Sequence, residues 1–179
     1  MRVERPVGGR SGESGAPTDE SAVRERGQTD APRAPAASSE AVRKSMQGNK
    51  RSNTKPELLM RARLREAGLS GYRLQWKVPG HPDIAWPKKK VALFVHGCFW
   101  HRCPHCQPSS PKSHVEYWAV KFERNVARDE RDRAALEAAG WRVHVVWECQ
   151  LKKKQIDATM ERLLPQLAEE LGKELRMGD

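Results

Sequence analysis

The sequence predicts an α/β domain in which helices pack on a central β-sheet. After residue 54, segments with apolar residues at helical spacing alternate with short runs rich in Val, Ile and aromatic residues. Their order is helix, three strands, helix, strand, helix, which is typical of layered α/β domains. All six Trp, all three Phe and both Tyr lie after residue 70, so this part of the chain has enough large apolar groups for a core.

The first helix is expected to begin after Thr54, because Thr54 and Glu57 have the three-residue spacing of a capping box. Apolar residues then recur at helical spacing as far as Gly68, a residue type that commonly ends helices. The next segment, 72–78, alternates apolar and polar residues, and we predict that it forms a strand.

A hairpin is expected next. Two apolar runs, 83–86 and 91–96, lie on either side of the basic turn Pro-Lys-Lys-Lys at 87–90. The string VALFV at 91–95 has the composition of a buried strand, so we place it inside the sheet.

The second half of the domain is predicted as helix, strand and helix. Ser113 and Glu116 repeat the capping-box spacing and open a long helix that ends at Gly140. A strand is expected at 141–147. The closing helix is amphipathic, since its apolar residues recur at helical spacing on a charged background: Ile156, Met160, Leu163, Leu164, Leu167 and Leu171.

Residues 1–42 are expected to be a disordered N-terminal arm, and residues 43–179 one folded domain. Gly, Pro, Ser and Ala dominate the arm, and it has no aromatic residue. The first 40 residues contain six Arg and seven acidic residues, so the net charge of +10 belongs to the folded part and favours a polyanionic partner. No apolar run approaches the ~20 residues that span a bilayer, and no secretory signal is visible, so we expect a soluble cytoplasmic protein without membrane contact.

Three of the four cysteines form the pattern C-x4-C-x2-C at Cys98, Cys103 and Cys106, and Cys149 lies at the end of the last predicted strand. Four thiolates brought together would form a closed tetrahedral zinc site with a structural role. His105 is an alternative fourth ligand, and His101 and His114 are more distant ones. Ordinary buried or free thiols are the other interpretation of these cysteines.

A second group of residues has the chemistry of a phosphodiesterase. Asp83 follows the rigid turn Pro-Gly-His-Pro and suits Mg²⁺, which prefers oxygen ligands. His96 and His101 flank the first cysteine and could supply a general base or a phosphate contact. Taken singly, each has an ordinary explanation, and Glu57 is accounted for by the capping box.

Basic and aromatic residues accompany this group. Phe99 and Trp100 lie inside the cysteine-rich loop, where they could insert between base pairs as a wedge or pack around the metal site. One face of the second long helix is basic, which suits DNA phosphates, although a solvated face with intrahelical ion pairs is equally compatible: Lys121, Arg124, Arg128 and Arg131.

Five strings occur in one order along the folded part: PGHPD at 79–83, VHGCFWH at 95–101, NVARD at 125–129, GWRV at 140–143 and VWEC at 146–149. Together they resemble the very-short-patch-repair (Vsr) mismatch endonuclease family over about residues 43–151. The resemblance implies a restriction-endonuclease-like fold, with a central mixed sheet flanked by helices. It also implies a Mg²⁺-dependent nick in one strand beside a thymine mispaired with guanine, the product of 5-methylcytosine deamination.

The resemblance also implies roles for individual residues. Asp83 would bind the catalytic Mg²⁺ with the backbone carbonyl of Val95, where a threonine is familiar in the family. His101 would be the general base, supported by Glu57 and His96.

The remaining residues would serve DNA binding and zinc. Phe99, Trp100 and Trp118 would form the wedge, and residues 41–54 would clamp the DNA. The four cysteines would hold the structural Zn²⁺, with more sulfur ligands than the histidine-rich loops of familiar members provide.

The expected partner is double-stranded DNA containing a mismatch, bound by a nucleoid-associated monomer, since nicking one strand needs one active site. Two alternatives remain open. One is a related nuclease that acts on other mismatches or on modified DNA. The other is a non-catalytic, zinc-stabilised DNA-binding module, for which Asp83 and His101 would be dispensable.

Overall fold

A computed structural model describes residues 35–36, 39–40, 43–44, 48, 50 and 52–176. Most of the predicted arm 1–42 and half of the segment 41–54 lie outside the described residues. Residues 34–179 group into one compact unit, which contains all of the elements described below.

The centre of this unit is a mixed four-stranded sheet in the order β1-β2-β3-β4. Its strands are β1 (Arg73–Leu74), β2 (Ile84–Trp86), β3 (Val91–His96) and β4 (Arg142–Trp147). β1 pairs with β2 and β2 with β3 in antiparallel fashion, whereas β3 and β4 are parallel. The parallel register pairs His96 with Trp147, so the carboxyl ends of β3 and β4 lie side by side.

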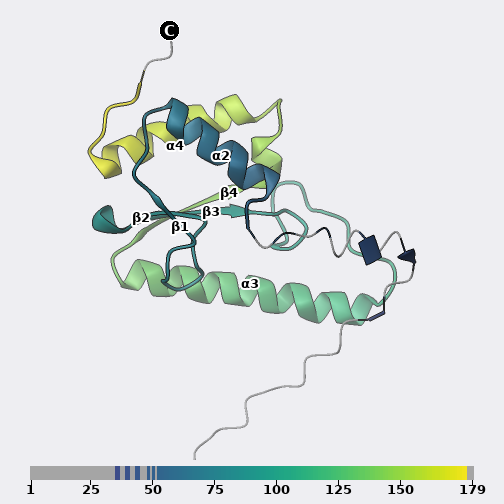
Figure 1. Cartoon of the computed structure of the whole chain (residues 1–179). Coiled ribbons are helices and arrows are strands. Elements are labelled where there is room, and N and C mark those ends of the chain that lie inside the picture. Colours follow the sequence, from purple (N-terminus) through teal and green to yellow (C-terminus); the bar gives the residue numbers. More distant parts are fainter. Residues whose placement is uncertain are drawn as a thin grey trace, which may run out of the picture. The chain divides into compact units, whose positions relative to one another are not determined.

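Helices cover both faces of the sheet. Within residues 52–176, the α-helices are α2 (Lys55–Glu66), α3 (Val115–Ala138) and α4 (Ile156–Leu171). Figure 1 shows α2 and α4 on one face and α3, the crossover between the parallel strands β3 and β4, on the other. The predicted α/β class and the predicted order of elements are therefore confirmed.

The main core lies between the sheet and the α2–α4 layer. Met60 and Leu64 of α2, Leu93 of β3 and Leu167 of α4 have no exposed surface. Burial of such a side chain stabilises the fold by roughly 1.5–3 kcal/mol. Because the predicted strand β3 is buried on this face, its carboxyl end has a fixed position.

Thr54 caps α2 as predicted, but Glu57 does not make the reciprocal bond to the Thr54 N–H that would complete the predicted capping box. The side chain of Thr54 accepts a hydrogen bond from the Glu57 N–H (3.5 Å), and Glu57 Oε1 accepts one from the Thr54 hydroxyl (2.8 Å). The other oxygen of Glu57 accepts from the Asn53 N–H (2.8 Å), one residue before the cap.

Two details of the predicted elements are wrong. The strand expected at 72–78 is confined to Arg73–Leu74, because Gln75 adopts a left-handed conformation (φ 47°) that ends the extended run. The second capping box does not form. Helix α3 begins at Val115 after His114, which has φ 53° and makes no capping hydrogen bond through its side chain.

The predicted hairpin is confirmed, and β2 and β3 are joined by a short 3-10 turn, Pro87–Lys89. Lys90 completes this turn in the left-handed region (φ 50°), and its Nζ donates to the carbonyl of Ala139 at the end of α3 (3.0 Å). The closing helix α4 also forms as predicted and accommodates Pro165 within it. Among the described helices, none is long and apolar enough to cross a membrane.

Candidate active site

The candidate site lies at the carboxyl end of β3, where a tight turn positions Asp83. This turn contains Gly80, which has φ +72°. A Cβ atom there would lie 3.1 Å from the ring of Phe94 and 3.2 Å from Cβ of Asp132. Only glycine combines this conformation with so close an approach, and the turn therefore holds the chain entering β2 against β3 and α3.

Asp83 is held by two hydrogen bonds. Its Oδ2 accepts from the backbone N–H of Val95 (2.7 Å), and its Oδ1 accepts from Gln75 Nε2 (3.0 Å). Burial raises the pKa of Asp83 to about 6, and the nearby charge of Glu57 adds to this rise, while the two hydrogen bonds oppose it. The charge of His101 also opposes the rise, but together with the two hydrogen bonds it does not offset burial, so the ionised Asp83 carboxylate is disfavoured in the protein itself.

Glu57 is a buried carboxylate, 6% exposed, whose charge acts on Asp83. Its hydrogen bonds to Thr54 and Asn53 fix both of its oxygens. Asn53 is itself held by Arg61, whose Nη2 donates to Asn53 Oδ1 (2.7 Å). The first turn of α2 thus fixes a second carboxylate beside Asp83.

His96 and His101 stack face to face, with ring centroids 4.1 Å apart. Nδ1 of His101 is hydrogen-bonded to Oδ2 of Asp129 on α3. Burial opposes ionisation of Asp129, but the hydrogen bond and charge of His101 outweigh it and lower the pKa of Asp129. An ionised Asp129 accepts a hydrogen bond from the Nδ1–H of His101, and a neutral imidazole that donates at Nδ1 has its lone pair on Nε2, which is the arrangement of a general base.

His96 is a strongly perturbed imidazole of this site. Burial, with a smaller contribution from the neighbouring His101, lowers the pKa of His96 to about 4. At neutral pH, His96 therefore contributes a hydrogen-bonding imidazole without charge.

Two sets of donors at this end of the sheet could hold a cation. Ligand atoms of His96, His101 and Asp129 lie within 4.8 Å of one another, a nitrogen-rich set that suits transition metals. The Asp83 carboxylate and the Val95 carbonyl offer oxygen atoms only, which Mg²⁺ prefers. Asp83 is half-buried and the contacts it makes within the protein do not offset the cost of its charge, which makes this second set a good fit for Mg²⁺.

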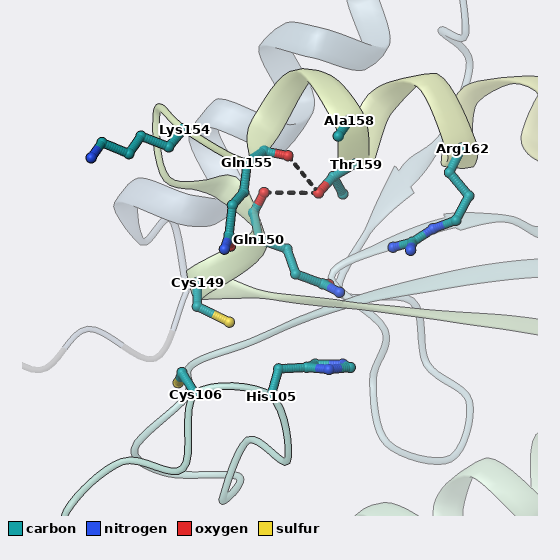
Figure 2. A pocket seen from close by; sticks show the side chains of 9 residues that line it. All are labelled: His105, Cys106, Cys149, Gln150, Lys154, Gln155, Ala158, Thr159 and Arg162. Atoms are coloured by element: carbon teal, nitrogen blue, oxygen red, sulfur yellow. Dashed lines mark hydrogen bonds between the residues drawn. The ribbon is translucent and has the colours of Figure 1, made fainter.

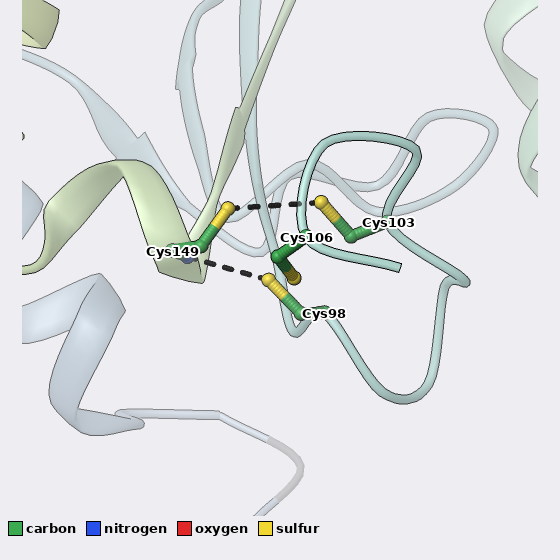
Figure 3. A group of neighbouring side chains, drawn as sticks. All are labelled: Cys98, Cys103, Cys106 and Cys149. Carbon is green, nitrogen blue, oxygen red and sulfur yellow. Dashed lines mark hydrogen bonds between the residues drawn. The ribbon is translucent and has the colours of Figure 1, made fainter. Parts of the chain in front are cut away.

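The four thiols predicted to converge do lie together. Figure 3 shows Cys98, Cys103 and Cys106 from one loop facing Cys149 after β4, and all four sulfur atoms are within 4.8 Å of one another. The Sγ atoms of Cys103 and Cys149 are 3.7 Å apart, close to the S···S separation of about 3.7 Å in a tetrahedron with Zn–S bonds of 2.3 Å. The donor set therefore fits a closed zinc shell.

Backbone amides support the thiol cluster. The N–H of Cys149 donates to Sγ of Cys98 (3.3 Å). Burial opposes ionisation of Cys103, but the N–H groups of Cys106 and His105 outweigh it and lower the Cys103 pKa. His105, the predicted alternative ligand, is not part of the four-cysteine group. Its ring centroid lies 6.4 Å from that of Trp147.

The predicted wedge residues form one aromatic group between the cysteine loop and the start of α3. The Phe99 ring contacts Trp100, Trp118 and Phe122, with centroids 5.0–5.6 Å apart. The side chain of Asn125 donates to the Trp100 carbonyl (3.0 Å) and ties the loop to α3. Phe99 and Trp100 are partly exposed, so they remain accessible for insertion into DNA.

The basic face of α3 shows both predicted features, exposed positive charges and ion pairs with acidic residues of the same helix. Lys121 lies over the Trp100 and Trp118 rings at 5.6 Å from each centroid. Arg124 and Arg128 are exposed, and Arg128 is within 3.4 Å of the Asp129 carboxylate. Arg131 pairs with the carboxylate next to it, Asp132 (3.0 Å). This face is cationic and is partly neutralised by its own acidic residues.

Sequence reasoning missed three supporting contacts of the site. In the sequence, Asp129 stands out only as the last residue of the NVARD string, although it holds His101. The amide of Gln75 on Asp83 and the guanidinium of Arg61 on Asn53 had no sequence signal. These contacts depend on how separate elements pack.

Comparison with known proteins identifies the family. The family model for the DNA mismatch endonuclease Vsr matches residues 37–107. The type II nicking enzyme V.XorIIP of Xanthomonas oryzae pv. oryzae is 48% identical over 115 residues, 64% of this chain and 84% of the relative. This chain belongs to the Vsr DNA mismatch endonuclease family.

Other members agree with this assignment. The type II nicking enzyme V.NaeI of Lentzea aerocolonigenes is 39% identical over 125 residues, 67% of this chain and 75% of the relative. The DNA mismatch endonuclease Vsr of Escherichia coli K12 is 39% identical over 104 residues, 53% of this chain and 66% of the relative. As a Vsr family member, the protein is a DNA endonuclease, and the mixed sheet between helices agrees with the restriction-endonuclease-like fold that the family implies.

Proposed function

We propose that this Vsr family member is a Mg²⁺-dependent endonuclease that nicks one DNA strand beside a T:G mismatch. The observation that carries the proposal is the position of Asp83, a half-buried carboxylate that precedes β2 and is hydrogen-bonded to Val95 near the end of β3, close to the stacked His96–His101 pair. Relatives named nicking enzymes and a mismatch endonuclease support the type of cut and the kind of substrate.

Asp83 and the Val95 carbonyl would hold the Mg²⁺, which would supply charge neutralisation at the phosphate and a more acidic water. His101 accepts the proton of the attacking water at Nε2, and Asp129 keeps its ring in position. His96 is neutral and donates a hydrogen bond to the phosphate. Glu57, held by Thr54 and Asn53, orients a water beside Asp83.

DNA would be engaged by the aromatic group and the basic face of α3. Phe99, Trp100 and Trp118 open the base stack at the mismatch, where an already mispaired step costs less energy to distort. Lys121, Arg124 and Arg128 follow the backbone phosphates. This difference in distortion energy is a physical source of selectivity for mismatched DNA.

The four cysteines would hold Zn²⁺ in a structural role. A shell filled by Cys98, Cys103, Cys106 and Cys149 leaves no open position for substrate. The zinc would join the loop after β3 to the segment after β4, and so fix the residues between Cys98 and Cys103, including His101.

The test is Mg²⁺-dependent nicking of a labelled duplex with one central T:G mismatch, compared with its fully paired control. The wild type should nick the thymine strand of the mismatched duplex, and Asp83→Ala should lose this activity while still binding DNA. Duplexes with other mismatches measure the breadth of recognition. Tight binding without any nick on these duplexes would refute the catalytic proposal and favour a zinc-stabilised binding module.

A further inference from the structure

A pocket of about 340 Å³ lies beside the thiol cluster, and the proposed catalytic steps do not use it. Figure 2 shows its walls. His105 and Cys106 of the cysteine loop form one side, and Gln150 after β4 with the first turns of α4 forms the other. The pocket therefore lies at the same end of the sheet as Asp83, on the layer that contains α4.

The lining of this pocket is basic. Lys154, Arg162 and the imidazole of His105 are among the described lining residues, and none of these lining residues carries a carboxylate. An adjoining hollow adds Lys152 and Lys153, so three consecutive lysines lie at one rim. Such an environment favours an anion.

The amide groups of the pocket add donors to this charge. The side-chain oxygen of Gln150 accepts from the Trp147 N–H (3.0 Å), so its amino group is the part that can donate to a ligand. The hydroxyl of buried Thr159 contacts the carbonyls of Gln150 and Gln155 (3.0 and 2.9 Å) and joins the two lining segments. The wall is thus held in place before a ligand arrives.

The position of the pocket indicates which anion it meets. The ring centroid of Trp147 lies 5.3 Å from that of His96 in the candidate active site and 6.4 Å from that of His105 in the pocket. A duplex at the ends of β3 and β4 would extend toward both helical layers, since α3 and α4 lie on opposite faces of the sheet. Duplex DNA carries a charge about every 1.7 Å along its axis, so phosphates are present throughout such a footprint.

We propose that this pocket binds a backbone phosphate of the DNA substrate, away from the scissile bond. The inference rests on the assignment of the chain as a DNA endonuclease, but not on T:G selectivity or on the catalytic roles. Lys154 and Arg162 supply the charge, and the Gln150 amide and His105 supply directed hydrogen bonds. The pocket extends the DNA contact from the basic face of α3 to the opposite layer.

The test compares two double variants that each remove one Lys and one Arg charge. Lys154→Gln/Arg162→Gln alters the pocket, and Lys88→Gln/Arg133→Gln removes the same charge from exposed positions outside it. Affinity for a fully paired duplex is measured in the Asp83→Asn background between about 50 and 200 mM salt. Zinc content is measured for each variant, and Gln155→Glu is a third variant that adds a negative charge to the wall.

We expect the pocket variant to lower the slope of log affinity against log salt by about 1–2, because each lost phosphate contact lowers it by about 1. Gln155→Glu should weaken binding at least severalfold, while the Lys88/Arg133 control keeps the wild-type slope. A pocket variant that retains zinc and keeps the wild-type slope overturns the proposal. A second result would also overturn it: inorganic phosphate stabilises the wild type but not the pocket variant, while the two proteins bind DNA equally well. The pocket would then hold free phosphate and not a phosphate of the DNA.

Discussion

Replacing Asp83 by Asn should stabilise the metal-free protein while it abolishes nicking. The pKa of Asp83 is raised from 3.8 to about 6, so the ionised carboxylate is disfavoured in the folded state. A shift of about two pKa units corresponds to about 3 kcal/mol of destabilisation at pH values well above 6. Asn retains an oxygen that can accept from Val95 N–H, and its neutral amide removes the charge, so we expect a gain of about 2 kcal/mol at pH 8.

The pH dependence fixes the sign of this effect. Between pH 4 and 6 the folded wild type binds more protons at Asp83 than the unfolded chain does, so this group makes the protein less stable as pH rises through that range. The stabilisation by Asp83→Asn should therefore be small near pH 4 and reach its full size above pH 7. Added Mg²⁺ should make the wild type more stable than Asp83→Asn at pH 8, because the cation would stabilise the wild type alone.

Urea unfolding in metal-free buffer that leaves the bound zinc in place measures both effects, at several pH values and then with added Mg²⁺. Asp157→Asn is a matched control, because the Asp157 side chain is 78% exposed and its replacement should change stability by less than about 0.5 kcal/mol. Destabilisation of the metal-free protein by Asp83→Asn at pH 8 would refute this reasoning. A difference in unfolding free energy between variant and wild type that does not depend on pH would also refute it, because the ionised Asp83 carboxylate would then not be disfavoured in the folded state.

Four further predictions concern the proposed catalytic and structural roles. Asp129→Asn should lower kcat for nicking by about a hundredfold or more with little change in duplex affinity, because the ring of His101 loses the carboxylate charge that favours the Nδ1–H tautomer and stabilises the protonated ring; equal loss of kcat and affinity would contradict this. The Mg²⁺ concentration for half-maximal nicking should rise up to about tenfold per pH unit below about pH 6, since protonation of Asp83 competes with the cation; a pH-independent value would count against Asp83 as the ligand. The purified protein should contain one Zn²⁺, and Cys149→Ser should lower zinc retention and thermal stability, whereas zinc content equal to the wild type would exclude Cys149 as a ligand. Trp100→Ala should reduce the fluorescence change of a base analogue placed at the mismatch, while binding to paired DNA changes little; an undiminished signal would exclude Trp100 from the wedge.

The elements that the sequence predicts best are those with strong local periodicity. The buried run 91–95 became β3, and the apolar spacing from Ile156 to Leu171 became α4, because both patterns are written in consecutive residues. The N-cap at Thr54 also formed, since it needs only a four-residue segment, although Glu57 bonds the Asn53 N–H and not the Thr54 N–H of a complete capping box. At Ser113 the same spacing failed, because His114 takes a left-handed conformation and the helix begins one residue later than a Ser113 cap requires.

The residue types of the candidate site could be predicted from the sequence, but the hydrogen bonds that hold these residues in place could not. The strings PGHPD and VHGCFWH identified Asp83, His96 and His101 because the functional groups occupy short segments with distinctive neighbours. Their supporting partners come from other elements: Asp129 from α3 and Gln75 from the chain beyond β1. Sequence spacing alone carries no information on these contacts.

The sequence by itself determined the α/β class, the order of the elements, the basic charge of the folded part and the family to which the chain belongs. Each of these depends on local patterns or on short strings of residues. Only the tertiary structure decided that burial outweighs the contacts that favour ionised Asp83, that Asp129 holds His101, and that the fourth thiol comes from the end of β4. The reason is physical: burial and hydrogen bonding depend on the parallel pairing of β3 with β4 across the α3 crossover, which brings residues distant in the chain together.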